Sequence, residues 1–258
     1  LALKALTSKK SAVELDFSHL RCAVNGAEPI KPETIRHFEQ TLAPYNLKNG
    51  TMRPGYGMAE TTLCISVGMS KERISQIDKI DLEKGIVTPT KNNKPGSFVE
   101  LVSCGSVPEE YLARIVDPNT LQVLPVNTVG ELWIQGDSVA SGYYKNPEKT
   151  KEIFGAFTAD THEGPFLRTG DLAFLDNNGH LTICGRVKDL IIINGRNIYP
   201  QDIEAICYQT DRALMPHCAA AFSITQDSGE ACVLVAEAKA ELGDTKYREI
   251  IAKIKKAV

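Results

Sequence analysis

Five short apolar runs, separated by turn residues, fill the middle of the chain and constrain its fold more than any other feature. They span residues 98–105, 110–117, 129–137, 172–176 and 180–186. The last two flank the sequence Asp-Asn-Asn-Gly, which favours a tight turn, so they predict a β-hairpin. We therefore expect an antiparallel β region, folded as a small barrel or sheet.

Patterns typical of strands and helices lie on both sides of this region. The part of the chain before this region has a short buried strand at 20–25 and a helix that begins at Pro32. The part after it starts near residue 188 and has a helix beginning at Pro200, two strands and a last helix. They predict a chain of mixed α/β and α+β class. Residues 69–98 are polar and weakly periodic, which indicates a surface insertion.

Composition excludes several classes of protein. A net charge of −3 leaves no strongly basic surface, so we expect no nucleic-acid partner. The seven cysteines include no C-x-x-C, which argues against a zinc site or a disulfide framework and indicates buried thiols in a reducing cytoplasm. No apolar run is long enough to cross a membrane. The chain starts without methionine and ends inside a helical pattern, so we expect a fragment.

The segment Gly-Tyr-Gly-Met-Ala-Glu-Thr-Thr at 55–62 combines groups suited to a nucleotide. Its glycines allow the backbone to pass close to a ligand, and Tyr56 between them offers a flat face for stacking on a base. Glu60 could bind Mg²⁺ through oxygen, while the hydroxyls of Thr61 and Thr62 could contact phosphate. The alternative is a tight turn with a buried tyrosine and a glutamate that caps a helix.

Two further motifs carry candidate ligand-binding groups. Asp171, in Arg-Thr-Gly-Asp-Leu, could accept both hydroxyls of a ribose, or it could simply cap a turn. Arg186 is a permanently charged donor for oxygen acceptors, and Lys188 with Asp189 lies where the two expected units join, as a hinge would. The alternative for both is a surface hairpin with ordinary charges.

The segment 130–144 has the sequence GELWIQGDSVASGYY and is interpreted as structural. Trp133, Tyr143 and Tyr144 are expected in the core. The five histidines show no metal-ligand spacing.

Four motifs, taken in their order and spacing, resemble the adenylate-forming superfamily of acyl-CoA synthetases, peptide-synthetase adenylation domains and luciferases. The motifs are YGMAETT, GELWIQGDSVASGYY, RTGDL and GRVKDLIIINGRNIYPQDIE. The wording of NGAEP, LVSCG, VKDLII and GRNIYPQDIE is most similar to fatty acyl-AMP ligases. The polar segment 69–98 matches the place where these ligases carry an insertion. The resemblance runs from about residue 20 to about residue 240.

The resemblance implies a domain organisation. Residues 1–187 would be the C-terminal portion of the large nucleotide- and acyl-binding domain, a sheet with helices plus a small β-barrel. Residues 188–258 would hold the hinge and an incomplete small α+β C-terminal domain. The phosphate loop would lie upstream of residue 1 and the catalytic lysine beyond Val258, so the resemblance implies that this piece alone is inactive.

The resemblance also implies an activity, which is the ATP- and Mg²⁺-dependent conversion of a fatty acid to acyl-AMP with release of pyrophosphate. The acyl group would pass to the phosphopantetheine of an acyl carrier protein or of a carrier domain in a polyketide or peptide synthase. One alternative is a fatty acyl-CoA ligase. An alternative of another class is a non-catalytic module that binds a nucleotide or an acyl-adenylate.

Roles for individual residues follow from the same resemblance. Glu60 would hold Mg²⁺, and Glu60 and Arg186 would be catalytic, with Lys188 at the hinge. Many family members carry Thr or Ser where this chain has Ala59, so an α-phosphate contact would fall to Thr61 or Thr62. The implied nucleotide-binding residues are Gly26, Ala27, Glu28, Tyr56, Gly57, Met58, Thr61, Asp171 and Arg186.

Overall fold

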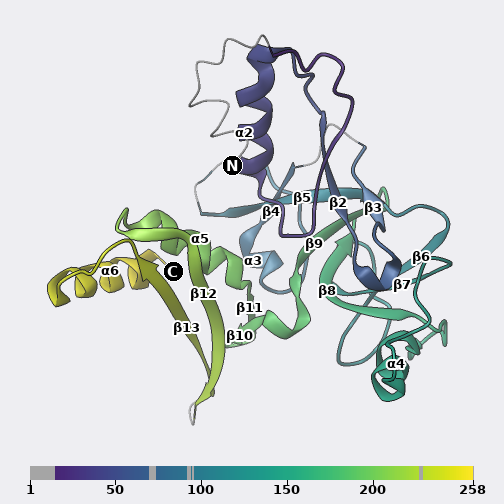
Figure 1. The fold of residues 1–258 in the computed structure, drawn as a ribbon. Coiled ribbons are helices and arrows are strands. Elements are labelled where there is room, and N and C mark those ends of the chain that lie inside the picture. The colour runs from purple at the N-terminus through teal and green to yellow at the C-terminus, as the bar shows by residue number, and fades with distance from the viewer. Residues whose placement is uncertain (1–14, 70–73, 92–93, 95, 227–228, 258) are drawn as a thin grey trace. The chain divides into compact units, whose positions relative to one another are not determined.

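The computed structural model describes residues 15–69, 74–91, 94, 96–226 and 229–257 (Figure 1). The chain divides into two compact units, and the boundary lies between Cys184 and Gly185. Each unit has its own strands and helices and is described by itself.

The first unit begins with a three-stranded sheet, in which β1 and β2 are parallel and β2 and β3 are antiparallel. Its elements are β1 (Ala23–Asn25), α2 (Pro32–Leu42), β2 (Met52–Tyr56) and β3 (Ser66–Val67). The expected strand at 20–25 is shorter than predicted and not buried, because β1 is an edge strand with Val24 65% exposed.

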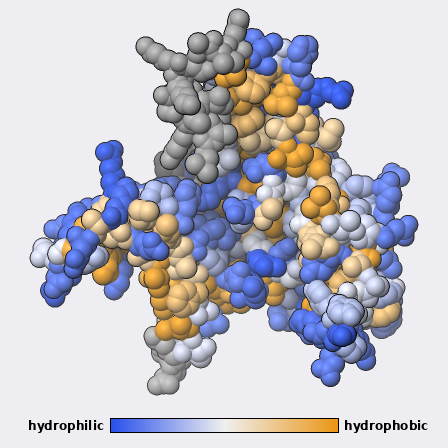
Figure 2. Space-filling model, in the orientation of Figure 1, coloured by the Kyte–Doolittle hydropathy of each residue, from blue (hydrophilic) through white to orange (hydrophobic). Residues whose placement is uncertain are grey.

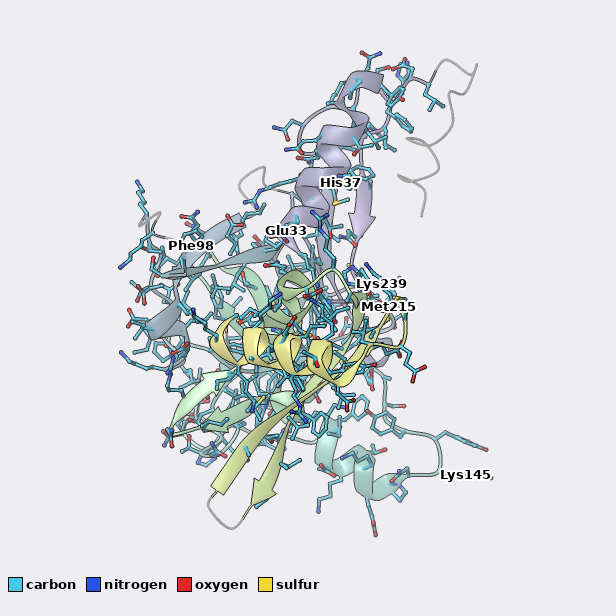
Figure 3. All side chains as sticks on the ribbon, turned by 90° about the vertical axis from the view of Figure 1, so that its left-hand side faces the viewer. Glu33, His37, Phe98, Lys145, Met215 and Lys239 are labelled. Carbon is cyan, nitrogen blue, oxygen red and sulfur yellow. The ribbon has the colours of Figure 1, made fainter. Side chains whose placement is uncertain are left out.

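Helix α2 confirms the helix predicted from Pro32, which occupies its first turn. Its buried face carries Ile35, which packs with Met52 of β2 and Val102. Glu33 and His37, one turn apart and both exposed, are labelled on α2 in Figure 3. The apolar face of the helix packs on the sheet, and its polar face is exposed to solvent.

The rest of the first unit is built on a six-stranded sheet of order β4-β5-β9-β8-β7-β6. The strands are β4 (Ile74–Asp78), β5 (Phe98–Ser106), β6 (Tyr111–Val116), β7 (Gly130–Gly136), β8 (Leu167–Leu175) and β9 (His180–Arg186). The pairs whose register is described are all antiparallel. The expected small barrel is wrong for the described residues, because the sheet ends at β4 and β6 and does not close.

The core of this sheet confirms the apolar runs of the sequence. The predicted hairpin is formed by β8 and β9, and the Gly179 N–H donates to the Asp176 carbonyl across the turn. Tyr56 and Met58 pack against the main core cluster, so the 55–62 segment is anchored in it. The buried members of that cluster are Ile65, Ile115, Leu132, Ile134, Ala173 and Leu181.

The segment 69–98 contains a strand, a short helix and buried residues as well as surface residues. Strand β4 pairs with β5 along its whole length, and the short helix α3 (Lys79–Leu82) follows it. Ile77, Leu82 and Val87 are buried, so a largely polar segment still supplies core residues at intervals too irregular to predict a strand. Parts of the segment, at 70–73, 92–93 and 95, lie outside the described residues.

Helix α4 (Pro147–Phe154) follows the 130–144 segment. Asn146 caps it by accepting a hydrogen bond from the Lys149 N–H, and Pro147 starts the first turn. Trp133 is buried as expected, but the expected burial of the two tyrosines is wrong: Tyr143 is 37% exposed and Tyr144 is 89% exposed. Both tyrosines stand in the loop before α4, outside the strand that buries Trp133.

The second unit is α+β, and α5 packs against β12 and α6. Its elements are β10 (Ile191–Ile193), β11 (Arg196–Ile198), α5 (Pro200–Thr210), β12 (Leu214–Gln226), β13 (Gly229–Ala238) and α6 (Asp244–Ala257). Ile191, Ile203 and Ala221 form one buried cluster. Figure 2 shows apolar side chains on the surface of the β12–β13 ribbon, where Phe222 and Val235 are exposed.

The cysteines only partly match the expected pattern of buried thiols. All seven are free, but just three of them, Cys104, Cys184 and Cys207, are buried. Burial raises the pKa of the Cys104 thiol to about 12, which keeps it protonated and unreactive near neutral pH. None of the described helices is both long enough and apolar enough to cross a membrane.

Candidate functional site

The carboxyl ends of β1 and β2 bring two predicted segments side by side. The last paired residues are Asn25 and Pro54, so Gly26 and Gly57 leave the sheet at neighbouring places. A Cβ on Gly26 would lie 2.7 Å from the Gly55 carbonyl oxygen, so there is no room for a side chain at this position. In parallel sheets the carboxyl ends of the strands are where ligands usually bind.

Gly57 is the most constrained glycine of the site. A Cβ at this position would lie 1.7 Å from the carbonyl oxygen of Leu63. No side chain fits there, because the chain after β2 folds back over its own end through the short 3₁₀ turn Ala59–Thr61. The glycine therefore permits the close return, after which the Ile65 N–H donates to the Tyr56 carbonyl over 2.9 Å.

Tyr56 and Asp171 meet directly, although 115 residues separate them in the chain. The phenolic O–H of Tyr56 donates to Oδ2 of Asp171 over 2.6 Å. A hydrogen bond to a charged acceptor is among the stronger kinds, so it holds the tyrosine ring and the carboxylate in a defined relation. Two of the predicted nucleotide-binding residues are thereby brought together.

A bulge in β8 presents Asp171 at this place. Trp133 on β7 pairs with Arg168, and Glu131 pairs with Leu172, so one residue of β7 faces three of β8. Within the bulge, Thr169 donates to the Leu132 carbonyl over 2.7 Å and accepts from the Asp171 N–H over 3.1 Å. Bulges re-aim side chains next to functional sites, and this one turns Asp171 away from the regular ladder.

Glu131 holds the bulge from inside the protein. Its carboxylate, 3% exposed, pairs with the partly exposed guanidinium of Arg168 over 2.8 Å. It also accepts from the Gly170 N–H over 3.2 Å, where φ of +71° suits glycine. The Arg168 guanidinium in turn lies 5.4 Å from the Trp133 ring centroid. A buried carboxylate is tolerated only with such partners.

Glu60 lies in the 3₁₀ turn that follows Gly57. The hydroxyl of Tyr143 donates to its Oε1 over 2.8 Å, and the Ala140 N–H donates to its carbonyl over 2.8 Å. Within the described chain, no donor contacts Oε2 of Glu60. The described residues contain no group of three His, Cys, Asp or Glu suited to a metal. Mg²⁺ is often bound by one carboxylate together with substrate phosphates, and Glu60 fits that arrangement.

The hydroxyls of Thr61 and Thr62 donate to backbone carbonyls in this structure, and a contact of either with phosphate stays a prediction. Thr61 is 1% exposed, and its hydroxyl donates to the Met58 carbonyl over 3.0 Å, so the hydroxyl is used inside the loop. The hydroxyl of Thr62 donates to the Ser138 carbonyl over 3.0 Å. Both threonines stabilise the loop that carries Glu60, because their donors are committed to backbone carbonyls.

Arg186 and Lys188 follow the boundary that divides β9 after Cys184, and both count with the second unit. Arg186 is the last residue of β9 and Lys188 lies in the 3₁₀ turn Val187–Asp189, and both side chains are exposed. Their meeting with Asp171 and Glu60 around one ligand stays a prediction. Ala27, with φ of +71°, and Glu28 follow Gly26 at the end of β1, and Met58 packs on the core beside Tyr56.

Three residues of the site were missed by sequence reasoning. Glu131 had a usable signal, since a carboxylate directly before the apolar run Leu-Trp-Ile, within an expected strand, predicts a paired buried charge. Ser138 and Tyr143 had none, because nothing local distinguishes Tyr143 from Tyr144. Both act through hydrogen bonds to the loop at 60–62.

A cavity of about 390 Å³ lies elsewhere in the first unit. None of the predicted nucleotide-binding residues lines it, so it is distinct from the Tyr56–Asp171 contact. Its lining consists of residues 64–69, Ser103, Gly105, Ser106, Pro108 and His180.

Proteins with named activities are similar in sequence to most of this chain. It is 38% identical to the medium-chain-fatty-acid–[acyl-carrier-protein] ligase JamA of Moorena producens, in an alignment of 258 positions that covers 98% of this chain. It is 40% identical to a 4-hydroxyphenylalkanoate adenylyltransferase of Mycobacterium tuberculosis, in an alignment of 206 positions that covers 77% of this chain. The chain spans 43% and 32% of the lengths of these two relatives.

Solved structures agree with this similarity. A fatty acyl-adenylate ligase structure from a study of the Escherichia coli and Legionella pneumophila enzymes matches 98% of this chain and 44% of its own, with a TM-score of 0.78 and 30% identity. The L. pneumophila ligase in complex with acyl adenylate and pyrophosphate matches 97% of this chain and 44% of its own, with a TM-score of 0.64 and 34% identity.

A family model described as AMP-binding enzyme matches residues 2–144, which is more than half of the chain and includes Tyr56, Glu60 and Tyr143. The chain therefore belongs to the AMP-binding enzyme family.

Proposed function

We propose that the protein to which this chain belongs converts a fatty acid and ATP to acyl-AMP and pyrophosphate. The observation that carries the proposal is the hydrogen bond between Tyr56 and Asp171, which joins two motifs 115 residues apart at the carboxyl end of β2. The names of the relatives support the same chemistry, since one is a fatty-acid ligase and one solved relative holds acyl adenylate and pyrophosphate.

The nucleoside would be held by the first unit. Gly26, Ala27 and Glu28 would lie beside the adenine, and the face of Tyr56 would stack on it. A carboxylate offers about four acceptor positions, so Asp171 can accept from ribose hydroxyls as well as from Tyr56. Because both side chains are tied to each other before a ligand arrives, less conformational entropy would be lost on binding.

The phosphates would lie towards Glu60, three residues beyond Gly57. ATP and a carboxylate substrate are both anions, so their approach needs positive charge. A bound Mg²⁺ would supply that charge, and Glu60 would contribute one carboxylate oxygen to it. Arg186 would add a permanent positive charge from the second unit, and Lys188 would mark the hinge between the units.

The proposed acceptor of the acyl group is the phosphopantetheine thiol of an acyl carrier protein or carrier domain. The relative JamA, named as a ligase for an acyl-carrier protein, supports this choice, whereas other relatives named as putative fatty-acid–CoA ligases keep coenzyme A as the alternative acceptor. The seven free thiols support a reducing compartment, the cytoplasm, as its location.

The activity is tested with the full-length parent protein. We expect pyrophosphate release when ATP and Mg²⁺ are mixed with fatty acids of graded length, and transfer of the acyl group to a carrier protein but not to coenzyme A. Transfer to coenzyme A instead would identify an acyl-CoA ligase. Binding of ATP without pyrophosphate release at any chain length would identify a non-catalytic module. The 258-residue chain alone is expected to be inactive.

Asp171→Ala is expected to weaken ATP binding to the full-length protein by about 1–3 kcal/mol, because a partner of the ribose hydroxyls is lost. Tyr56→Phe keeps the ring but removes the donor to Asp171, and is expected to cost about 0.5–1.5 kcal/mol. Isothermal titration calorimetry measures both. Asp117→Ala, at a turn in the same unit, is the control and should leave ATP affinity unchanged. Equal affinities for all the variants would refute the assignment of Asp171.

A further inference from the structure

The loop that carries Glu60 is held in a strained conformation. Thr62 has φ of +71° and ψ of −54°, and the Leu63 N–H donates to the Thr61 carbonyl over 2.9 Å, which defines a γ-turn. This region is unfavourable for a β-branched residue, so surrounding contacts must hold it. The turn lies directly after Glu60 and sets the direction in which that residue leaves the backbone.

Those contacts come from residues 138–140, far away in the chain. The hydroxyl of Ser138 donates to the Thr61 carbonyl over 3.1 Å, and the Ser138 carbonyl accepts from the Thr62 hydroxyl over 3.0 Å. The Ala140 N–H donates to the Glu60 carbonyl over 2.8 Å. Three hydrogen bonds thus fix the backbone of Glu60 and of the two residues after it.

The carboxylate of Glu60 is fixed by the same segment, three residues further on. The Tyr143 hydroxyl donates to Oε1 over 2.8 Å, and no other described residue donates to this carboxylate.

Tyr143 is itself held from behind by helix α4. Its N–H donates to the Thr150 hydroxyl over 2.9 Å, and its ring packs edge-on against Phe154 with centroids 5.2 Å apart. Thr150 and Phe154 are four residues apart and so share one face of the helix. Gly142 allows this approach, since a Cβ there would lie 2.2 Å from Thr150 Cγ2. The tyrosine is pre-positioned by a helix rather than by a mobile loop.

We propose that Tyr143 is a positioning residue for Glu60: it holds Oε1 so that Oε2 is directed to a divalent cation bound with the nucleotide phosphates. The proposal rests on the proposed function, which assigns the cation to Glu60. It gives a role to a segment, 130–144, whose tyrosines the sequence pattern assigns to the core. The Glu60 side chain would otherwise sample several rotamers before binding.

The test compares Tyr143→Phe, Glu60→Gln and their double variant in the full-length protein. Mn²⁺ binding in the presence of a non-hydrolysable ATP analogue, followed by electron paramagnetic resonance, gives a readout independent of turnover. We expect Tyr143→Phe to weaken Mn²⁺ binding about 10- to 100-fold, as for loss of one hydrogen bond to a charged group. Affinity for the analogue without metal, and the melting temperature, should stay unchanged. In the Glu60→Gln background, Tyr143→Phe should have no further effect.

Tyr144→Phe is the matched control, because Tyr144 is 89% exposed and has no hydrogen bond to Glu60. Its ring lies 5.3 Å from the Lys145 Nζ, and Figure 3 shows Lys145 extending outwards from the loop before α4. This variant should bind Mn²⁺ as the unmodified protein does.

The possible results distinguish the positioning role of Tyr143 from the metal-binding role of Glu60. If Glu60→Gln weakens Mn²⁺ binding but Tyr143→Phe does not, the positioning role is overturned and the metal role of Glu60 stands. If Glu60→Gln has no effect, the metal assignment fails and the positioning role fails with it. If Tyr143→Phe lowers the melting temperature and weakens the analogue equally with and without metal, its role is structural and the proposal is overturned.

Discussion

Gly57→Ala in the full-length protein is expected to lower pyrophosphate release by at least about 100-fold. The added methyl group would lie 1.7 Å from the Leu63 carbonyl oxygen, an overlap that no side-chain rotation can relieve. The backbone from 57 to 63 must therefore move, and Glu60 moves with it. Displacement of a reacting group by about 1 Å can cost about 100-fold in rate.

The control for this variant is Gly243→Ala in the second unit. Nothing lies within 4 Å of a Cβ at Gly243, and its backbone has no positive φ, so the same chemical change should leave the activity intact. Comparison of pyrophosphate release by the two variants measures the effect of the clash alone. Comparable activities for both would show that the loop at 57–63 adapts and that its geometry does not limit the reaction.

Glu131→Ala is expected to destabilise the first unit by about 3–5 kcal/mol. The change leaves the Arg168 guanidinium and the Gly170 N–H without the buried carboxylate that pairs with both. Because Arg168 is partly exposed and can recruit water, a value near the lower limit is expected. Trp133, the single tryptophan of the chain, contacts Arg168, so its fluorescence reports unfolding of this unit in denaturant.

The matched control for Glu131 is Glu163→Ala. Glu163 pairs with Arg114 over 2.8 Å in the same unit, but its side chain is 39% exposed. Solvent screens such a pair, so its loss should cost much less stability than loss of the Glu131 carboxylate. If both variants lose the same stability, burial of the Glu131 carboxylate is not what stabilises the bulge. ATP affinity should fall only in Glu131→Ala, since Asp171 stands in that bulge.

Local structure followed closely from the sequence. Pro32 and Pro200 start helices because proline is favoured in the first turn, where its missing N–H has no helical partner. The turn at 176–179 joins β8 and β9 because Asp176 and Gly179 suit the tight reversal. Strand β4 escaped prediction, since its pairing with β5 depends on a neighbour that the local pattern does not reveal.

The same limit explains the errors about the site. Tyr143 and Tyr144 are chemically identical neighbours, and only the position of α4 makes the first of them a partner of Glu60. A barrel was one of two foldings that the antiparallel strand pattern left open, whereas closure depends on whether the edges β4 and β6 pair. Neither the partner of Tyr143 nor the pairing of the sheet edges can be deduced from the hydrophobic periodicity of the sequence.

The sequence by itself determined the helices that begin at Pro32 and Pro200, the last helix, the hairpin, the glycines at the ends of β1 and β2, and the order of motifs that marks the family. It could do so because these features depend on backbone preferences and on residues a few positions apart. Only the tertiary structure decided that Tyr56 bonds Asp171 and that Tyr143 bonds Glu60. These pairs are 115 and 83 residues apart, and their contact depends on a bulge, a strained turn and the packing of one helix.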